Sequence, residues 1–570
     1  RYFDTFDVPV RYGFGFGLSY TTFSISSPNV TLTGVGTENP TLTAEVEVTN
    51  TGEQYSGKEV VQVYVSCPQQ GLPKEYRRLA GFAKTKELSP KETQKLTISF
   101  PLYQLSSYDE SSASWILDGG NYGIWIGNSL QDAVLCAVME LDGQAVLISG
   151  TNICKPQKRV EEIAPDQEVL LKKQEKWETA AKERNLPFVQ VKAAQLLTRK
   201  IEYKADYEEL TGRAGEIVNS MTPEQLILLA TGDISMGQGS TIGAAGQSVP
   251  GAAAETTSAF VDPPFEVASI VLADGPAGLR LNRQYQVKDG KTKRMDFLES
   301  FEGGLLLNEK PKHDPDEETY WQFCTAMPVG ALLAQSWDLE LVRQLGEMIG
   351  NEMKLFEITL WLAPGMNIHR NPLCGRNFEY YSEDPFLAGM MAAAMTLGVQ
   401  SVQGCGTTIK HFACNNQEDN RMGSDSMLSE RALREIYLKG FEIAVKHAQP
   451  MSIMTSYNMI NGVHAANNYD ICTRAARDEW GFEGTIMTDW TTTTMSNAGV
   501  CTASGCMRAG NDIVMPGDPA DHENLRAALA DGSLPLHVLR RCVYHTVRVI
   551  LQSNQYEDAV SYEKQFHKQK

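Results

Sequence analysis

The sequence lacks a dense block of basic residues, and it lacks an apolar run long enough to cross a membrane. Its formal net charge is −19 over 570 residues. Nucleic-acid-binding surfaces concentrate lysine and arginine, and a membrane-spanning helix needs about 20 consecutive apolar residues. We therefore expect neither nucleic acid nor a membrane among the partners.

The eleven cysteines lack the close pairing that is typical of zinc sites. Cys501 and Cys506 stand too far from other candidate ligands to suggest zinc. Cys136 lies in an apolar run, which is typical of a reduced core thiol. Reduced thiols favour a cytoplasmic location. The sequence thus predicts a cytoplasmic protein with no metal and no cofactor.

Two composition changes divide the chain, whose length already suggests more than one domain. From about residue 20 to 148, short strands such as 42–50 alternate apolar and polar residues between Pro and Gly turns, which predicts a β-sandwich. Residues 149–206 are charged and helical in pattern, which predicts a solvated helical linker.

From about residue 207 to 570, apolar strand-like runs alternate with amphipathic helices. Such alternation is typical of a parallel α/β architecture. No glycine fingerprint for a dinucleotide follows the first strand, so a (β/α)8 TIM-type barrel is favoured over a doubly wound sheet. The strand candidates are 268–273, 358–363, 407–410, 451–456, 485–488 and 512–515.

Polar and aromatic side chains follow successive strand candidates, where barrel enzymes place their active residues. Charged groups bind sugar hydroxyls, and aromatic rings cover the apolar face of a sugar. A site for a neutral, hydroxyl-rich ligand is therefore predicted, with Asp489 as a carboxylate that could act as a nucleophile. The candidates are Asp274, Arg280, Arg376, Lys410, His411, Met454, Tyr457, Asp489 and Trp490.

Each candidate taken alone also has a structural interpretation. An acid at a strand end can cap the next helix, an arginine usually forms a structural ion pair, and Met454 suits a core. The glycine-rich segment 237–246 lacks the lysine of a phosphate loop and predicts a plain loop. What favours function is the recurrence of such residues at successive strand ends of one domain.

Several segments together carry family motifs: 272–280, 371–385, 410–412, 454–458 and 481–490. On these motifs the chain resembles glycoside hydrolase family 3, of the β-glucosidase type. Segments 57–65 and 79–82 resemble the fibronectin type III-like domain of that family, and 13–20 resembles the exit from its α/β sandwich domain.

The resemblance implies a domain order in which the fibronectin-like part precedes the barrel. Residues 1–19 would end an α/β sandwich domain, 20–148 would form the fibronectin type III-like domain, 149–206 the linker, and 207–570 the catalytic barrel. The chain begins at Arg1, and the resemblance leads us to expect a sandwich domain upstream of it.

The resemblance also implies residue roles. Asp489 matches the nucleophile that forms a covalent glycosyl-enzyme, and Asp274 matches the carboxylate that holds sugar hydroxyls in the −1 subsite. Other −1 ligands would be Arg280, Arg376, Lys410, His411 and Tyr457, while Met454 and Trp490 would shape the pocket.

A retaining glycosidase needs a second carboxyl group about 5 Å from the nucleophile. Glu379 and Glu418 lie near motif residues, but structural roles are favoured for both. In the β-glucosidases of the family this acid/base is a glutamate of the sandwich domain, so we expect it outside this chain.

These expectations combine into a retaining exo-β-glucosidase that removes terminal non-reducing β-D-glucosyl residues from a glucoside or an oligosaccharide. Two alternatives stay open. One is another exo-β-glycosidase, acting on a xyloside, a galactoside or a plant glucoside. The other is a sugar-binding fragment without turnover. The sequence is also compatible with a homo-oligomer.

Overall fold

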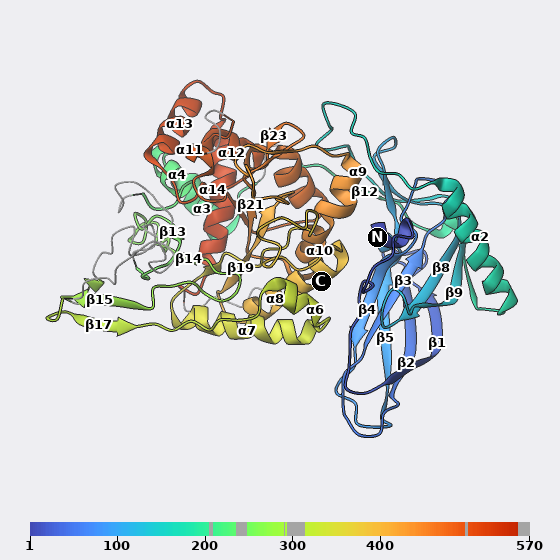
Figure 1. The fold of residues 1–570 in the computed structure, drawn as a ribbon. Helices are drawn as coiled ribbons and strands as arrows, with labels where there is room; N and C mark the ends of the chain where they lie inside the picture. Colours follow the sequence, from blue (N-terminus) through green and yellow to red (C-terminus); the bar gives the residue numbers. More distant parts are fainter. Residues whose placement is uncertain (205–208, 235–247, 290, 293–313, 496–499, 557–570) are drawn as a thin grey trace.

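The computed structural model describes the chain apart from residues 205–208, 235–247, 290, 293–313, 496–499 and 557–570. A β-domain lies beside a larger α/β domain, with the β-domain first in the chain (Figure 1). This confirms the expected multidomain organisation.

The β-domain consists of antiparallel strands extended by two short parallel ones. In β2 the even-numbered residues are buried, as the alternation in its sequence predicts. One sheet has the order β1 (Phe23–Thr33), β2 (Thr41–Asn50), β5 (Thr93–Pro101). A second has the order β11 (Phe188–Val191), β9 (Val134–Leu141), β8 (Gly120–Gly127), β3 (Val60–Ser66), β4 (Arg78–Lys84), and a third β12 (Arg199–Lys200), β10 (Ala145–Ser149), β7 (Ser114–Leu117), β6 (Ser107–Asp109).

The segment expected to be a helical linker, 149–206, does contain a helix, α2 (Gln167–Glu183). The Asp166 side chain caps its first turn. Trp177 of this helix packs with Leu135 and Val138 in a small core. The segment also supplies β11 and β12, which pair in parallel with β9 and β10 and which the sequence pattern did not reveal. Much of the segment therefore packs onto the β-domain.

The α/β domain is built on a six-stranded sheet that hydrogen-bonded pairs extend into a closed ring. Bridges Met487–Ile513, Val514–Thr231 and Gly232–Thr256 lead from its last strand back to its first. The strands between β14 and β24 run parallel, whereas β13 is antiparallel to its neighbours. The order is β13 (Ala254–Glu255), β14 (Val271–Ala273), β18 (Leu360–Trp361), β19 (Gly406–Phe412), β21 (Ser452–Thr455), β24 (Thr485–Met487).

Helices between the strands cover this sheet. The helices α7 (Leu339–Leu355) and α8 (Pro385–Gln400) start at Asp338 and Asp384, whose side chains accept backbone hydrogen bonds of the first turn. They touch through glycines, because a Cβ at Gly398 would lie 2.0 Å from the Arg343 carbonyl oxygen.

Further helices are α1 (Tyr2–Thr5), α3 (Gly212–Ser220), α4 (Pro223–Leu229), α6 (Gly330–Gln335), α9 (Glu430–Ala432), α10 (Lys439–Ala448), α11 (Thr492–Met495), α12 (Ala503–Ala509), α13 (Pro519–Ala530) and α14 (Leu536–Leu551). Shorter turns are η1 (Leu102–Leu105), η2 (Ala193–Gln195) and η5 (Ala465–Asn467), with π-helical turns η4 (Leu433–Tyr437) and η6 (Asp470–Glu479). Two small sheets complete the domain: β15 (Gln284–Lys288), β16 (Lys291–Thr292), β17 (Glu318–Trp321), and β20 (Asp425–Ser426), β22 (Met459–Ile460), β23 (Val463–His464).

A buried arginine joins the two domains. The Arg434 guanidinium donates to Glu430 at 2.8 Å and to Glu479 at 2.6 Å. It also lies over the ring of Tyr108 in the β-domain, 4.5 Å from the ring centre, and donates to the carbonyl oxygen of Thr151. Its side chain is 4% exposed. The contacts fix the β-domain against η4 of the α/β domain.

In the part of the chain that the structure describes, no helix is long and apolar enough to cross a membrane.

Replacing Arg434 by methionine leaves Glu430 and Glu479 buried without their cation. Breaking a buried ion pair from one side costs about 3–5 kcal/mol, so we expect a clearly lower midpoint in thermal unfolding followed by circular dichroism. Arg526→Met is the matched control, because the Arg526–Glu224 pair is exposed and such pairs contribute about 0–1 kcal/mol. Equal midpoints for the two variants would contradict the role given to Arg434.

Candidate active site

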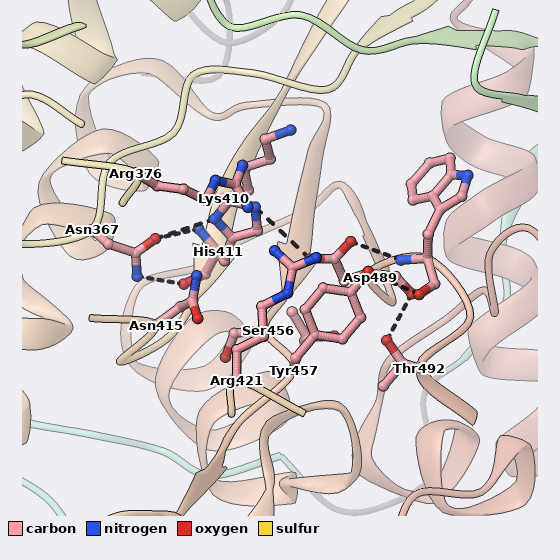
Figure 2. A network of polar contacts seen from close by, with 12 residues as sticks. Asn367, Arg376, Lys410, His411, Asn415, Arg421, Ser456, Tyr457, Asp489 and Thr492 are labelled. Atoms are coloured by element: carbon pink, nitrogen blue, oxygen red, sulfur yellow. Dashed lines mark hydrogen bonds and ion pairs between the residues drawn. The ribbon is translucent and has the colours of Figure 1, made fainter. Parts of the chain in front are cut away.

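Asp489 lies two residues after β24 and beside a cluster of charged side chains (Figure 2). Its Oδ1 accepts a hydrogen bond from the backbone N–H of Trp490 at 2.7 Å, and its carbonyl oxygen accepts one from the Thr492 hydroxyl at 2.7 Å. Among the described residues, its buried Oδ2 has no hydrogen-bond partner. The carboxylate is thus held through one oxygen while the other is left available.

The pKa of Asp489 is raised, because burial removes water from the carboxylate; the positive charges of Lys410, Arg376 and Arg421 oppose this effect. The Nε2 atom of His411 lies 3.8 Å from Oδ2. Figure 2 shows Arg376, Lys410, His411 and Arg421 gathered on one side of Asp489. Lys410 and His411 lie in β19, whereas Arg376 follows β18 and Arg421 follows β19, so neighbouring strands supply the charges.

Asp274 follows β14 and is paired with two cations. Lys410 Nζ lies 2.7 Å from its Oδ1, and Arg280 Nη2 lies 3.4 Å from its Oδ2. Burial would raise the pKa of Asp274, but the two cations outweigh burial and lower it to about 2. This side chain is therefore an ionised hydrogen-bond acceptor at neutral pH.

Arg376 and Arg421 are each held by a glutamate. Arg376 makes two hydrogen bonds of 2.8 Å to Glu379, and Arg421 donates to Glu418 at 2.8 Å. The Arg421 guanidinium also lies 4.7 Å from the centre of the Tyr457 ring. Glu379 and Glu418 thus orient cations, which is the structural role expected for them from the sequence.

His411 is fully enclosed. Its backbone N–H donates to Asn367 Oδ1 at 2.7 Å, and its Nδ1 lies 3.2 Å from the Tyr380 hydroxyl. Burial and the nearby cations Arg376 and Lys410 lower its pKa well below the usual range. The imidazole is therefore neutral at physiological pH and acts as a hydrogen-bonding group rather than a cation.

Tyr457, Trp490 and Met454 form the apolar side of the cluster. The Tyr457 hydroxyl donates to the carbonyl oxygen of Trp490 at 2.9 Å, and the Trp490 indole donates to that of Ala253 at 3.3 Å. Met454 is 1% exposed and shares a core with Trp490 and Met487. Met454 therefore supports the Trp490 side of the site from within the core.

All nine residues singled out in the sequence follow or lie in strands of one sheet, and Asp489, Lys410, His411, Tyr457 and Arg376 are drawn together (Figure 2). Sequence reasoning missed Asn367, Asn415 and Arg421. Asn367 is in the segment after β18 and Arg421 in the loop after β19, so their places after strand candidates could have indicated them. Among the described residues, no group of three His, Cys, Asp or Glu side chains could hold a metal ion.

Two family models match the chain. The glycosyl hydrolase family 3 N-terminal domain matches residues 318–549, and the fibronectin type III-like domain matches residues 59–130. The chain therefore contains a glycosyl hydrolase family 3 N-terminal domain. The first match spans β18 to β24 together with Lys410, His411 and Asp489, and the second lies before it in the chain, which confirms the predicted domain order.

Relatives with curated descriptions include beta-glucosidases and exo-alpha-(1->6)-L-arabinopyranosidases. A beta-glucosidase of Ruminococcus albus is 34% identical over 578 residues, which is 97% of this chain and 54% of that protein. An exo-alpha-(1->6)-L-arabinopyranosidase of Bifidobacterium breve is 54% identical over 166 residues, 29% of this chain and 22% of that protein. This chain spans about half the length of the first of these relatives.

Among solved structures, a beta-glucosidase from Paenibacillus barengoltzii is similar over nearly the whole chain. The TM-score is 0.75 at 33% identity, and the match covers 97% of this chain and 57% of that one. Both domains and their order therefore recur in that beta-glucosidase.

Proposed function

We propose that this chain carries the nucleophile and most of the −1 subsite of a retaining exo-β-glucosidase. The observation that carries the proposal is Asp489, a buried strand-end carboxylate whose Oδ2 has no hydrogen-bond partner among the described residues. It lies among cations in a family whose relatives include beta-glucosidases. Covalent catalysis by a carboxylate is an established route for glycosidases.

The proposed scaffold is a variant of the (β/α)8 barrel. The closed ring of six strands and two bridged segments supports it, with β13 reversed relative to its neighbours. In such a barrel the ends of parallel strands converge on one face. That geometry explains why residues after β14, β19 and β24 meet.

In the proposed reaction, Asp489 attacks the anomeric carbon through Oδ2 and forms a glycosyl-enzyme, which water then hydrolyses. The attack requires an ionised carboxylate, and Lys410 and Arg376 favour that state against the effect of burial. Asp274, ionised by Lys410 and Arg280, is suited to accept hydrogen bonds from sugar hydroxyls. Trp490 offers an aromatic face to the sugar ring.

The second carboxyl group of a retaining mechanism must be protonated before it can protonate the leaving group. Asp274 is unsuited to this role because its pKa is lowered to about 2. Glu379 and Glu418 are occupied by Arg376 and Arg421. No carboxyl group described beside Asp489 therefore suits the general acid, and we propose that an α/β sandwich domain outside this chain supplies it.

A second candidate function is an exo-acting pentopyranosidase. The 54% identity to an arabinopyranosidase over 166 residues favours it specifically. The two sugars differ at C5, where glucose carries a hydroxymethyl group that arabinopyranose lacks, and in the configuration of the C4 hydroxyl. The ratio of kcat/KM for nitrophenyl β-glucoside and nitrophenyl α-L-arabinopyranoside separates the two candidates.

A 2-deoxy-2-fluoro-β-glucoside with a good leaving group should label Asp489. The fluorine slows both the formation and the hydrolysis of the glycosyl-enzyme, while the good leaving group still allows its formation. The glycosyl-enzyme therefore accumulates, and peptide mass mapping locates the labelled residue. Asp489→Asn should remove the label and lower kcat roughly 10⁴-fold. Asp274→Asn is the matched control, since it weakens sugar binding but keeps the nucleophile. Label on another residue would overturn the assignment.

The acid limb of the pH profile of kcat/KM should follow the ionisation of Asp489. Arg376 lowers the pKa of Asp489, so Arg376→Met should raise that pKa and move the acid limb to higher pH. Activity would then be lost earlier as the pH falls. Arg526→Met, which changes an exposed cation, should leave the limb in place; a limb that stays fixed in both variants would contradict the electrostatic account.

Substrates that need no protonation should be favoured by this chain alone. General acid catalysis contributes roughly 10²–10⁴-fold, so the chain should hydrolyse cellobiose weakly relative to dinitrophenyl glucoside, compared with a complete family member. If the chain and a complete enzyme hydrolyse cellobiose and dinitrophenyl glucoside with the same ratio of rates, the general acid lies within these 570 residues.

A further inference from the structure

A pair of buried cysteines lies beside a histidine and an asparagine, away from the charged cluster. The Sγ atoms of Cys501 and Cys506 are 4.0 Å apart. The side-chain amide of Asn467 donates to both sulfurs, at 3.4 Å to Cys501 and 3.1 Å to Cys506. All eleven cysteines of the chain are free thiols. Two sulfurs that share one donor form a local environment suited to a negative charge.

His464 adds a further donor. Its Nδ1 accepts a hydrogen bond from the Ala466 backbone N–H at 3.2 Å, so the neutral ring carries its proton on Nε2. That Nε2 atom is buried and has no hydrogen-bond partner among the described residues. His464 is 2% exposed. The nearby His464 lowers the pKa of the Cys501 thiol.

The two thiols differ strongly in acidity. A hydrogen bond from Cys506 lowers the pKa of Cys501 to about 6 in spite of burial, and His464 and Asn467 add to the effect. The pKa of Cys506 is instead raised, chiefly by burial. At neutral pH one sulfur of the pair is thus a thiolate and its neighbour a thiol. The thiolate is the reactive form of cysteine.

We infer that Cys501 and Cys506 are a peroxide-oxidisable dithiol, with Cys501 as the attacking sulfur and Cys506 as the resolving one. The geometry of the sulfur pair with Asn467 and His464 carries the inference, which does not depend on the proposed glycosidase function. Cys501 is 2% and Cys506 0% exposed, so the oxidant must be as small as hydrogen peroxide.

The reaction balances with hydrogen peroxide as the oxidant. The Cys501 thiolate attacks one peroxide oxygen, the O–O bond breaks, and hydroxide leaves, which gives a sulfenic acid. The Cys506 thiol loses its proton to that hydroxide, and its sulfur attacks the Cys501 sulfur. The S–O bond breaks, and the departing hydroxide takes up a proton from solvent. Two thiols and one peroxide thus yield one disulfide and two waters.

The disulfide would join Cys501, which lies just before α12, to Cys506 within α12. Thr502, next to Cys501, donates its backbone N–H to Asn467 Oδ1 and caps α12 with its side chain. Closing the sulfurs from 4.0 Å to bonding distance of about 2 Å would therefore displace the start of α12.

The test treats the whole chain with hydrogen peroxide at pH 7, alkylates the remaining thiols in denaturant and maps the peptides. The peptide 478–508 contains both cysteines. It should lose about 2 Da and escape alkylation, while Cys542 and Cys472 stay alkylated. Oxidised glutathione, which is bulky, should not produce this disulfide. Alkylation of both Cys501 and Cys506 after peroxide treatment would overturn the inference.

Variants assign the two roles. Cys506→Ser should stop the reaction at a sulfenic acid on Cys501, which dimedone traps, whereas Cys501→Ser should leave Cys506 unoxidised. Cys542→Ser is the matched control, a buried thiol whose pKa is raised by burial, and it should not change the disulfide yield. Dimedone labelling of Cys506 in the Cys501→Ser variant would show that Cys506, and not Cys501, is the attacking sulfur. The wild-type mapping stands even if a variant fails to fold.

Discussion

Lys410 connects the two carboxylates on which the site depends. Its Nζ pairs with Asp274 at 2.7 Å, and its charge opposes the burial that raises the pKa of Asp489. One cation on β19 therefore keeps Asp274 ionised and helps Asp489 to ionise, although the two acids follow different strands. The closed ring of strands makes this arrangement feasible, because it brings the ends of β14, β19 and β24 to one place.

The other charged residues of the site are also held by ion pairs. Glu379 and Glu418 hold Arg376 and Arg421 in position, and His411 is kept neutral by its surroundings. The acids that orient cations are thereby unavailable for proton transfer. Under the proposed function, such a site supplies the nucleophile and the sugar-binding groups, and its acid comes from elsewhere. The Arg434 contacts fix the β-domain. They are separate from the charged groups around Asp489, all of which belong to the α/β domain.

Apolar runs and the residues after them predicted much of this arrangement. The runs at 268–273, 407–410 and 485–488 correspond to β14, β19 and β24, and Asp274, Lys410 and Asp489 stand where expected. The two-residue strand β13 was missed because so short a segment leaves no period to detect. β11 and β12 were missed because partners distant in sequence define them. Cys501 looked isolated for the same reason, because its partner Asn467, at the end of η5, lies 34 residues away in the sequence.

The central claim is that Oδ2 of Asp489 faces the anomeric carbon of a sugar held by Asp274 and Lys410. A crystal structure of the chain with a trapped 2-deoxy-2-fluoroglucosyl group tests it most directly. The account predicts continuous density from Asp489 Oδ2 to C1, with sugar hydroxyls on Asp274 and Lys410. A sugar bound with C1 on another carboxylate, or with its hydroxyls away from Asp274, would contradict it.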